Sequence, residues 1–174
     1  MALPELPTTP LSRRIDPFLE RVGEGVSWLW LLLLAVIVGN VTLRYAFGEG
    51  RIELEEIQWH LYSLGFLLGL SYAFQADAHI RVDVLSQRWP PRWRAWLELY
   101  GLLLALLPFI ALVLWYSMPF VTSSWDASEI SPSPGGLALR WLIKAVLPLG
   151  FFLLLLAALS RLSRLWVYLF WGRT

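Results

Sequence analysis

Four long apolar runs dominate the pattern of hydrophobic and polar positions along the chain. They cover residues 26–43, 57–76, 99–125 and 137–159, and only Arg140 and Lys144 interrupt the last of them. A helix rises about 1.5 Å per residue and the hydrocarbon core of a bilayer is about 30 Å thick, so each run can cross a membrane once. The pattern predicts four transmembrane helices with spans of about 22–43, 55–76, 95–118 and 137–160.

A soluble helical bundle is the alternative to a membrane protein. Its helices would carry a polar side opposite the apolar stripe, whereas residues 30–38 and 151–156 are apolar all round. Charged residues make up 16% of the chain, against about 25% in a soluble domain, and they are segregated. These features exclude a disordered chain and a basic nucleic-acid binder. The first run is longer than a signal-peptide core and is expected to be a retained span.

The distribution of arginine and lysine predicts the orientation of the four spans. Ten lie before the first span, between the second and third, or after the fourth: Arg13, Arg14, Arg21, Arg81, Arg88, Arg92, Arg94, Arg161, Arg164 and Arg173. Four lie in or near the other two connections: Arg44, Arg51, Arg140 and Lys144. The positive-inside rule then places both termini in the cytoplasm. We expect an all-α integral membrane protein with one membrane domain over 1–174 and a loose tail over 1–15.

Proline positions predict where two of the helices begin. Asp16 and Pro17 fit an N-cap and a first helical residue, so the first helix is expected to start there. Trp89, followed by Pro90 and Pro91, breaks the middle connection and fits the start of the third helix. Pro108 and Pro148 are expected to kink the third and fourth spans.

A charged cluster precedes the second span and offers candidate functional residues. It contains Arg51, Glu53, Glu55 and Glu56, and Arg44 at the end of the first helix can reach it. Two adjacent glutamates can share a proton or bind a cation, but they can also cap a helix N-terminus. We favour the structural role over cation binding and predict pairing of Arg44 with Glu55 or Glu56 on the side of the membrane away from the cytoplasm.

Other polar and small residues within the spans invite structural interpretations. Arg140 and Lys144 lie four apart on one helix face, which is expected to meet a partner protein or lipid headgroups. Gly65 and Gly69 form a GxxxG motif, which indicates close helix packing. His60 and His79 are 19 residues apart, about 28 Å on one helix, so they cannot ligate one haem iron.

No catalytic, metal-binding or cofactor-binding pattern is found in the sequence. The chain has no cysteine, which excludes disulfides, zinc–cysteine sites and iron–sulfur clusters. The spans lack the polar lining of a channel and the paired broken helices of a transport site. A membrane anchor for a redox enzyme, holding haem or quinone, stays open as the alternative function.

Several motifs together resemble a known family. They are the run 44–48 (RYAFG), Glu55 and Glu56 with Trp59, the pair Gly65 and Gly69, and residues 77–85 with His79, Arg81 and Asp83 in the order H-x-R-V-D. In order, spacing and four-span topology the chain is similar to the small membrane subunit (Q subunit) of tripartite ATP-independent periplasmic (TRAP) transporters.

The resemblance implies a function and a set of partners. TRAP transporters import organic acids across the bacterial inner membrane, driven by an ion gradient, usually of sodium, and a periplasmic binding protein delivers the substrate. The large membrane subunit moves as an elevator, and the small subunit is expected to be its fixed scaffold. Residues expected to be structural or to contact the partner are Arg44, Glu55, Glu56, Trp59, Gly65, Gly69, His79, Arg81, Asp83, Arg140 and Lys144. Membrane lipids are further expected partners, whereas nucleic acid and cofactors are not.

Overall fold

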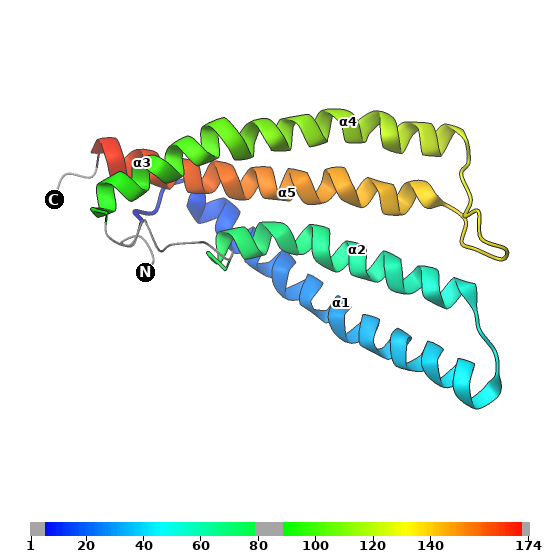
Figure 1. Cartoon of the computed structure of the whole chain (residues 1–174). Helices are drawn as coiled ribbons and strands as arrows, with labels where there is room; N and C mark the ends of the chain where they lie inside the picture. Colours follow the sequence, from blue (N-terminus) through cyan, green and yellow to red (C-terminus); the bar gives the residue numbers. More distant parts are fainter. Residues whose placement is uncertain (1–5, 79–88, 172–174) are drawn as a thin grey trace.

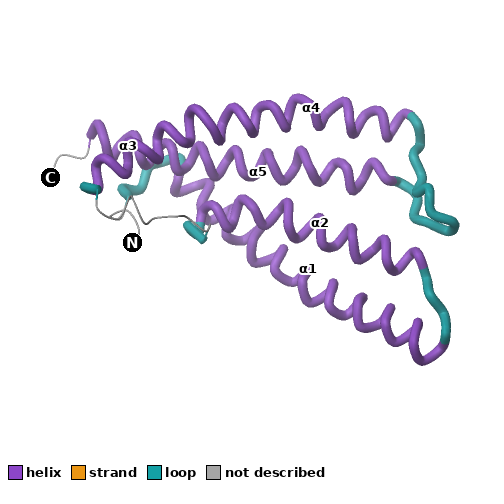
Figure 2. Tube along the Cα trace, viewed as in Figure 1, coloured by secondary structure: helices purple, strands orange, loops and turns teal. Residues whose placement is uncertain are grey.

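The computed structural model describes residues 6–78 and 89–171, and these residues form helices and no strand (Figures 1 and 2). The main helices are α1 (Ser12–Phe47), α2 (Ile52–Gln75), α3 (Pro91–Gly101), α4 (Leu107–Asp126) and α5 (Arg140–Trp166). A π-helical segment, η2 (Leu102–Leu106), joins α3 to α4, and a second, η3 (Val167–Trp171), extends α5. The predicted all-helical fold is confirmed for the described residues.

Three continuous helical stretches are long and apolar enough to cross a membrane. They are Ser12–Phe47, Pro91–Asp126 and Arg140–Trp171. The fourth predicted span falls on α2, whose 24 residues are long enough but include polar residues such as Gln58, His60 and Gln75, and α2 is not among these three stretches. A crossing by α2 is therefore not established by length and composition, and the four-span topology stays a prediction.

Helix α5 lies at the centre of the bundle. It packs against α4 on one side and α2 on the other, while α1 packs mainly on α2 (Figure 1). At the crossing of α2 and α5 the backbones approach closely, because a Cβ on Gly150 would lie 2.7 Å from the carbonyl oxygen of Leu67. Leu19 of α1 forms a small buried cluster with Leu153 and Ala157 of α5. The main core lies between α5 and the stretch from α3 to α4.

The described residues 6–15 do not form the loose tail that was expected over 1–15. Leu6 and Thr9 are buried, and α1 begins at Ser12 rather than at Pro17. The backbone N–H of Thr9 donates to Ser12 Oγ at 2.9 Å, and the backbone N–H of Ser12 donates to Thr9 Oγ1 at 3.1 Å. This reciprocal arrangement is a capping box. Pro10 lies between Thr9 and Ser12, at a position where no helix hydrogen bond needs its missing N–H. The pattern Thr-Pro-x-Ser over residues 9–12 indicates this helix start, as the pair Asp16 and Pro17 indicates a later one.

The structure also shows where the third helix starts and where the prolines expected to kink the spans lie. Helix α3 begins at Pro91 with Pro90 as its N-cap, as predicted. Pro108 lies just after the π-helical segment η2, where the i→i−4 hydrogen-bond ladder is already interrupted. Pro148 lies inside α5, and Pro119 inside α4.

Candidate functional site: charged clusters at the two ends of the bundle

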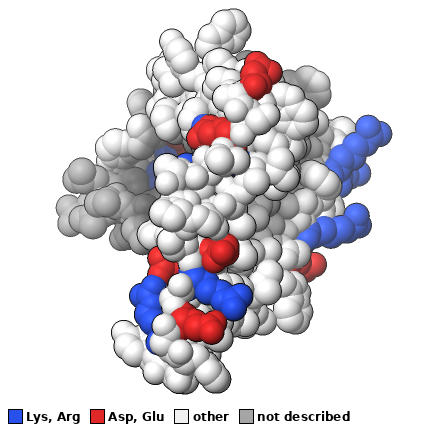
Figure 3. All heavy atoms as spheres, turned by 90° about the vertical axis from the view of Figure 1, so that its right-hand side faces the viewer, with Lys and Arg blue, Asp and Glu red and all other residues white. Residues whose placement is uncertain are grey.

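The turn between α1 and α2 carries a dense group of charges (Figure 3). Arg44 forms an ion pair with Glu55, which joins the end of α1 to the start of α2. Arg51 pairs with Glu49 at 3.2 Å, and both pairs are largely exposed. The predicted pairing of Arg44 is therefore confirmed, and its partner is Glu55.

Glu56 has a different role from its neighbour. Its carboxylate accepts hydrogen bonds from the Ser131 hydroxyl and from the backbone N–H of Leu137, the latter at 2.6 Å. Ser131 and Leu137 belong to the loop between α4 and α5, so Glu56 fixes that loop onto α2. The loop must carry glycine at position 136, because a Cβ there would lie 2.5 Å from Ser131 and 2.8 Å from the Glu56 carboxylate.

Glu129, in the same loop, is paired with the two cations of α5. Lys144 donates to one carboxylate oxygen, and the Arg140 Nε lies 3.8 Å from the other. The hydrogen bond from the Lys144 ammonium holds the pKa of Glu129 below its usual value. The Lys144 ammonium also lies 4.3 Å from the centre of the Phe120 ring.

These contacts place Arg140 and Lys144 beside an acidic residue of their own chain. The reason is that the α4–α5 loop folds back over the first turn of α5, so Arg140 donates its backbone N–H to the Glu129 carbonyl at 3.2 Å. The expected contact of this helix face with a partner protein or lipid headgroups stays a prediction. We name the residues Arg44, Glu55, Glu56, Glu129, Arg140 and Lys144 the loop-end cluster.

A second group of charges lies at the opposite end of the bundle. Arg161 of α5 donates through Nε to Glu98 of α3 at 2.6 Å, and both side chains are only 15% exposed. The same guanidinium lies 3.9 Å from Asp77, just beyond the end of α2. Arg161 thus connects α5 to α3 and to the residue just beyond α2, and its own side chain is mostly buried.

Arg164 and Ser160, on the same stretch of α5, hold the start of α1. Arg164 lies 3.5 Å from the Asp16 carboxylate and donates to the Leu6 carbonyl at 3.1 Å. Ser160 donates to the other Asp16 oxygen at 2.5 Å. We name Asp16, Asp77, Glu98, Arg161 and Arg164 the terminal-end cluster. From the sequence, Asp16 is predicted only as a helix cap and the arginines only indicate topology, because pairing between distant helices leaves no local pattern.

The remaining predicted residues are placed as follows. Gly65 packs against Trp30 of α1, which agrees with close helix packing, whereas a Cβ on Gly69 would meet nothing within 4 Å. Trp59 is 71% exposed on α2. His79, Arg81 and Asp83 lie outside the described residues. Any partner contact of these residues stays a prediction.

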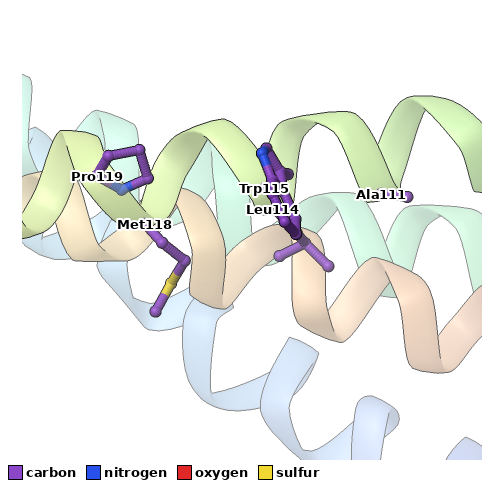
Figure 4. A pocket seen from close by; sticks show the side chains of 5 residues that line it. All are labelled: Ala111, Leu114, Trp115, Met118 and Pro119. Atoms are coloured by element: carbon purple, nitrogen blue, oxygen red, sulfur yellow. The ribbon is translucent and has the colours of Figure 1, made fainter.

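The described residues offer little to a redox cofactor. Within 6–78 and 89–171 there is no group of three or more His, Asp or Glu side chains that could hold a metal ion. The His60 Nδ1 lies 2.5 Å from the Glu56 carbonyl oxygen one turn earlier in α2, which is a local helix contact. A shallow apolar groove on α4 is lined by Ala111, Leu114, Trp115, Met118 and Pro119 and carries no ionisable group (Figure 4). Nothing here supports the redox-anchor alternative.

Long apolar helices, joined at each end by ion pairs within the chain, define a multi-pass helical membrane protein. The comparisons with known proteins give the family. The profile of "Tripartite ATP-independent periplasmic transporters, DctQ component" matches residues 33–167, which are 135 of the 174. The chain therefore belongs to the DctQ family, the small permease component of TRAP transporters.

A curated relative agrees with this assignment. A protein of Haemophilus influenzae (strain ATCC 51907 / DSM 11121 / KW20 / Rd), named "Putative TRAP transporter small permease protein", is 33% identical over 89 residues. The match covers 51% of this chain and 55% of the relative, so it spans about half the length of each. The family is that of a transporter component.

Proposed function

We propose that this chain is the small membrane subunit of a secondary TRAP transporter that imports an organic acid. The proposed driving force is an ion gradient, and the proposed ion is sodium. A large permease subunit and a periplasmic substrate-binding protein are its proposed partners. The family match over residues 33–167 carries the proposal. The location that goes with it is the bacterial inner membrane.

The proposed role is that of a rigid scaffold for the large subunit. Two observations support it. The loop-end and terminal-end clusters tie the helices together at both ends, with Arg161 alone reaching residues of three elements. The buried backbone contact between Gly150 and Leu67 also leaves α2 and α5 little freedom to slide. An elevator-type partner requires a neighbour that keeps its depth and tilt while the moving domain travels.

We further propose four membrane crossings with both termini in the cytoplasm. The arginine count supports this orientation, with ten basic residues on the proposed inner side and four on the outer. Under it, the terminal-end cluster lies at the cytoplasmic face and the loop-end cluster at the periplasmic face. His79, Arg81 and Asp83 would then lie on the cytoplasmic side, where we expect them to contact the large subunit.

Co-expression with the large permease and binding-protein subunits tests the function. We expect the tagged chain to retain the large subunit through purification in detergent, and we expect uptake of a radiolabelled organic acid to require all three proteins and a sodium gradient. A matched strain that lacks only this chain should lose uptake and accumulate less of the large subunit. Full uptake without the chain, or recovery of the tagged chain free of the large subunit from the strain that co-expresses both, would contradict the proposal.

A further inference from the structure

Two amide side chains near the turn between α1 and α2 carry buried polar atoms without a hydrogen-bond partner. They are the side-chain oxygen of Asn40 on α1 and the side-chain nitrogen of Gln58 on α2, and neither has a partner among the described residues. Asn40 as a whole is only 7% exposed. A buried polar group that stays unpaired lowers the stability of the fold, so both atoms require an explanation.

The ion pair at the end of these helices places the two amides at nearly the same level. Helices α1 and α2 are antiparallel and are joined by a short turn (Figure 1). Asn40 lies four residues before Arg44, and Gln58 lies three residues after Glu55, the partner of Arg44. At about 1.5 Å per residue, both amides lie about 5–6 Å inward from that pair, which is one helical turn.

The two amides also face the contact between the two helices. Gly65 of α2 packs against Trp30 of α1. Gln58 lies seven residues before Gly65, which returns it to within about 20° of the same side of α2. Toward its C-terminal end α1 diverges from α5 and stays beside α2, so α2 is the helix that covers Asn40 (Figure 1). Counting from Trp30 and Gly65 again brings Asn40 and Gln58 to within about 5 Å of one level.

The two atoms are complementary, yet the structure shows no hydrogen bond between them. Asn40 presents an acceptor and Gln58 presents a donor. The Gln58 N–H group would repel a cation, and the Asn40 oxygen would repel an anion. A ligand that satisfies both atoms must be small and uncharged, and it must donate one hydrogen bond and accept another. Water meets these requirements, and one water molecule can join two polar groups that do not touch.

We propose that one buried water molecule binds between Asn40 and Gln58, donating to the Asn40 oxygen and accepting from the Gln58 nitrogen. It joins α1 to α2 one helical turn inward from the Arg44–Glu55 pair. Buried waters of this kind are part of a folded structure, because they satisfy polar groups that would otherwise stay unpaired. This water site belongs to the chain itself and does not depend on the proposed transport function.

Apolar substitutions in the full chain, purified in detergent, test the site. If a water joins the two amides, Asn40→Leu removes one of the two groups that hold it and leaves the Gln58 donor poorly satisfied, and Gln58→Leu does the same to Asn40. Each single variant is expected to melt about 2–4 °C lower, as for about one lost hydrogen bond in a chain of this size. The double variant is expected to recover most of the loss, because no unpaired amide remains.

The opposite result follows if each amide is simply unpaired. Single variants that melt at or above the temperature of the unchanged chain, or losses that add in the double variant, would overturn the proposal. Ser63→Ala is the matched control on α2, because the Ser63 hydroxyl bonds within its own helix to the Trp59 carbonyl at 2.8 Å. Its effect should add to that of Asn40→Leu, and a coupling as large as that with Gln58→Leu would also overturn the assignment.

Nuclear magnetic resonance distinguishes a bound water from a direct hydrogen bond between the two amides. The chain has three glutamines, Gln58, Gln75 and Gln87, so selective isotope labelling gives three side-chain amide signals, and Gln58→Leu assigns one of them. In the unchanged chain we expect a rotating-frame cross-relaxation peak between the Gln58 amide protons and a long-lived water, and we expect Asn40→Leu to abolish it. The signal of Gln75, which donates to the Asp16 carbonyl at 2.9 Å, should stay the same. A Gln58 amide without a cross-peak to water would overturn the proposal.

Discussion

Gly150 and Gly69 differ in what surrounds them, and this difference gives a residue-scale prediction. A Cβ on Gly150 would lie 2.7 Å from the Leu67 carbonyl oxygen, which is backbone and cannot turn aside, whereas a Cβ on Gly69 would meet nothing within 4 Å. Gly150→Ala is expected to destabilise the bundle by about 1–3 kcal/mol, as overpacking does. Thermal unfolding of the purified chain in detergent measures it. Gly69→Ala is the control, and equal losses for the two would contradict the packing described here.

The Glu129 carboxyl gives a prediction on pH. Its pKa is lowered from 4.5 by the hydrogen bond from Lys144, so the folded chain holds its proton less tightly than the unfolded chain. Such a group contributes stability above its unfolded pKa and loses it as pH falls through the lower, folded value. The melting temperature of the chain is therefore expected to fall on acidification below about pH 4.5 more steeply than that of Glu129→Gln.

The control for this titration is Glu49→Gln, which alters an exposed pair with Arg51. It should retain the acid sensitivity of the unchanged chain. If Glu129→Gln and the unchanged chain follow the same curve of melting temperature against pH, the Lys144 hydrogen bond does not contribute to folding stability.

The sequence identified some of these residues and missed others for a physical reason. Arg44 and Glu55 are separated by one short turn, so their encounter could be predicted from helix ends alone. Glu129 lies 15 residues before Lys144, and their contact depends on how the α4–α5 loop folds back. Charge pairing of that kind is decided by tertiary geometry, which residue spacing does not encode.

At the scale of elements, α1 and α2 pair with a seven-residue repeat. On α1, Ser12, Leu19, Leu33 and Asn40 are the positions buried at intervals of seven or fourteen. Gly23 and Trp30 of α1, seven apart, contact Tyr72 and Gly65 of α2, also seven apart. A seven-residue repeat is the pattern of left-handed packing with side chains of one helix between those of the other. Asn40 is a buried polar residue within this repeat, and its side-chain oxygen has no hydrogen-bond partner among the described residues.

Arg161 supports an element-scale prediction, because it connects α5 to α3 and to the end of α2. Arg161→Met would leave the Glu98 carboxylate poorly hydrated and without its strongest partner, a change that typically costs about 3–5 kcal/mol. We expect a large fall in the melting temperature in detergent. Arg51→Met, which removes an exposed pair, should cost at most about 1 kcal/mol.

Restoring neutrality provides the complementary measurement. The double variant Arg161→Met with Glu98→Gln should recover part of the lost stability, since the uncompensated charge is gone. If the double variant is no more stable than Arg161→Met alone, the loss comes from packing of the arginine stem and not from the buried charge.

The elements themselves were largely predictable, and their ends were less so. The runs without charged residues predicted the positions of the helices, because a helix that crosses the hydrocarbon core must consist mostly of apolar residues. The extension of α1 back to Ser12 was not predicted, since it depends on Leu6 and Thr9 meeting α5. The π-helical segment Leu102–Leu106 has no apolar signature that would distinguish it from an ordinary helix.

At the scale of the whole molecule, the proposed topology can be tested directly. Ala138→Cys in the α4–α5 loop and Arg92→Cys at the start of α3 are both exposed positions. A membrane-impermeant maleimide added to intact spheroplasts should label Ala138→Cys only, and both variants should label after lysis. Labelling of both, or of Arg92→Cys alone, in intact spheroplasts would overturn the orientation.

The connection between the two ends of the sequence has a consequence for how the protein is made. Thr9 is hydrogen-bonded to Ser163, and Leu6 to Arg164, across 154 and 158 positions of the chain. The first helix is therefore synthesised long before the residues of α5 that it contacts. Only when α5 has been inserted can Leu6, Thr9 and Asp16 find their partners on it. A chain whose synthesis is arrested before residue 160 would lack Ser160, Ser163 and Arg164, and with them the contacts that hold the start of α1 in place.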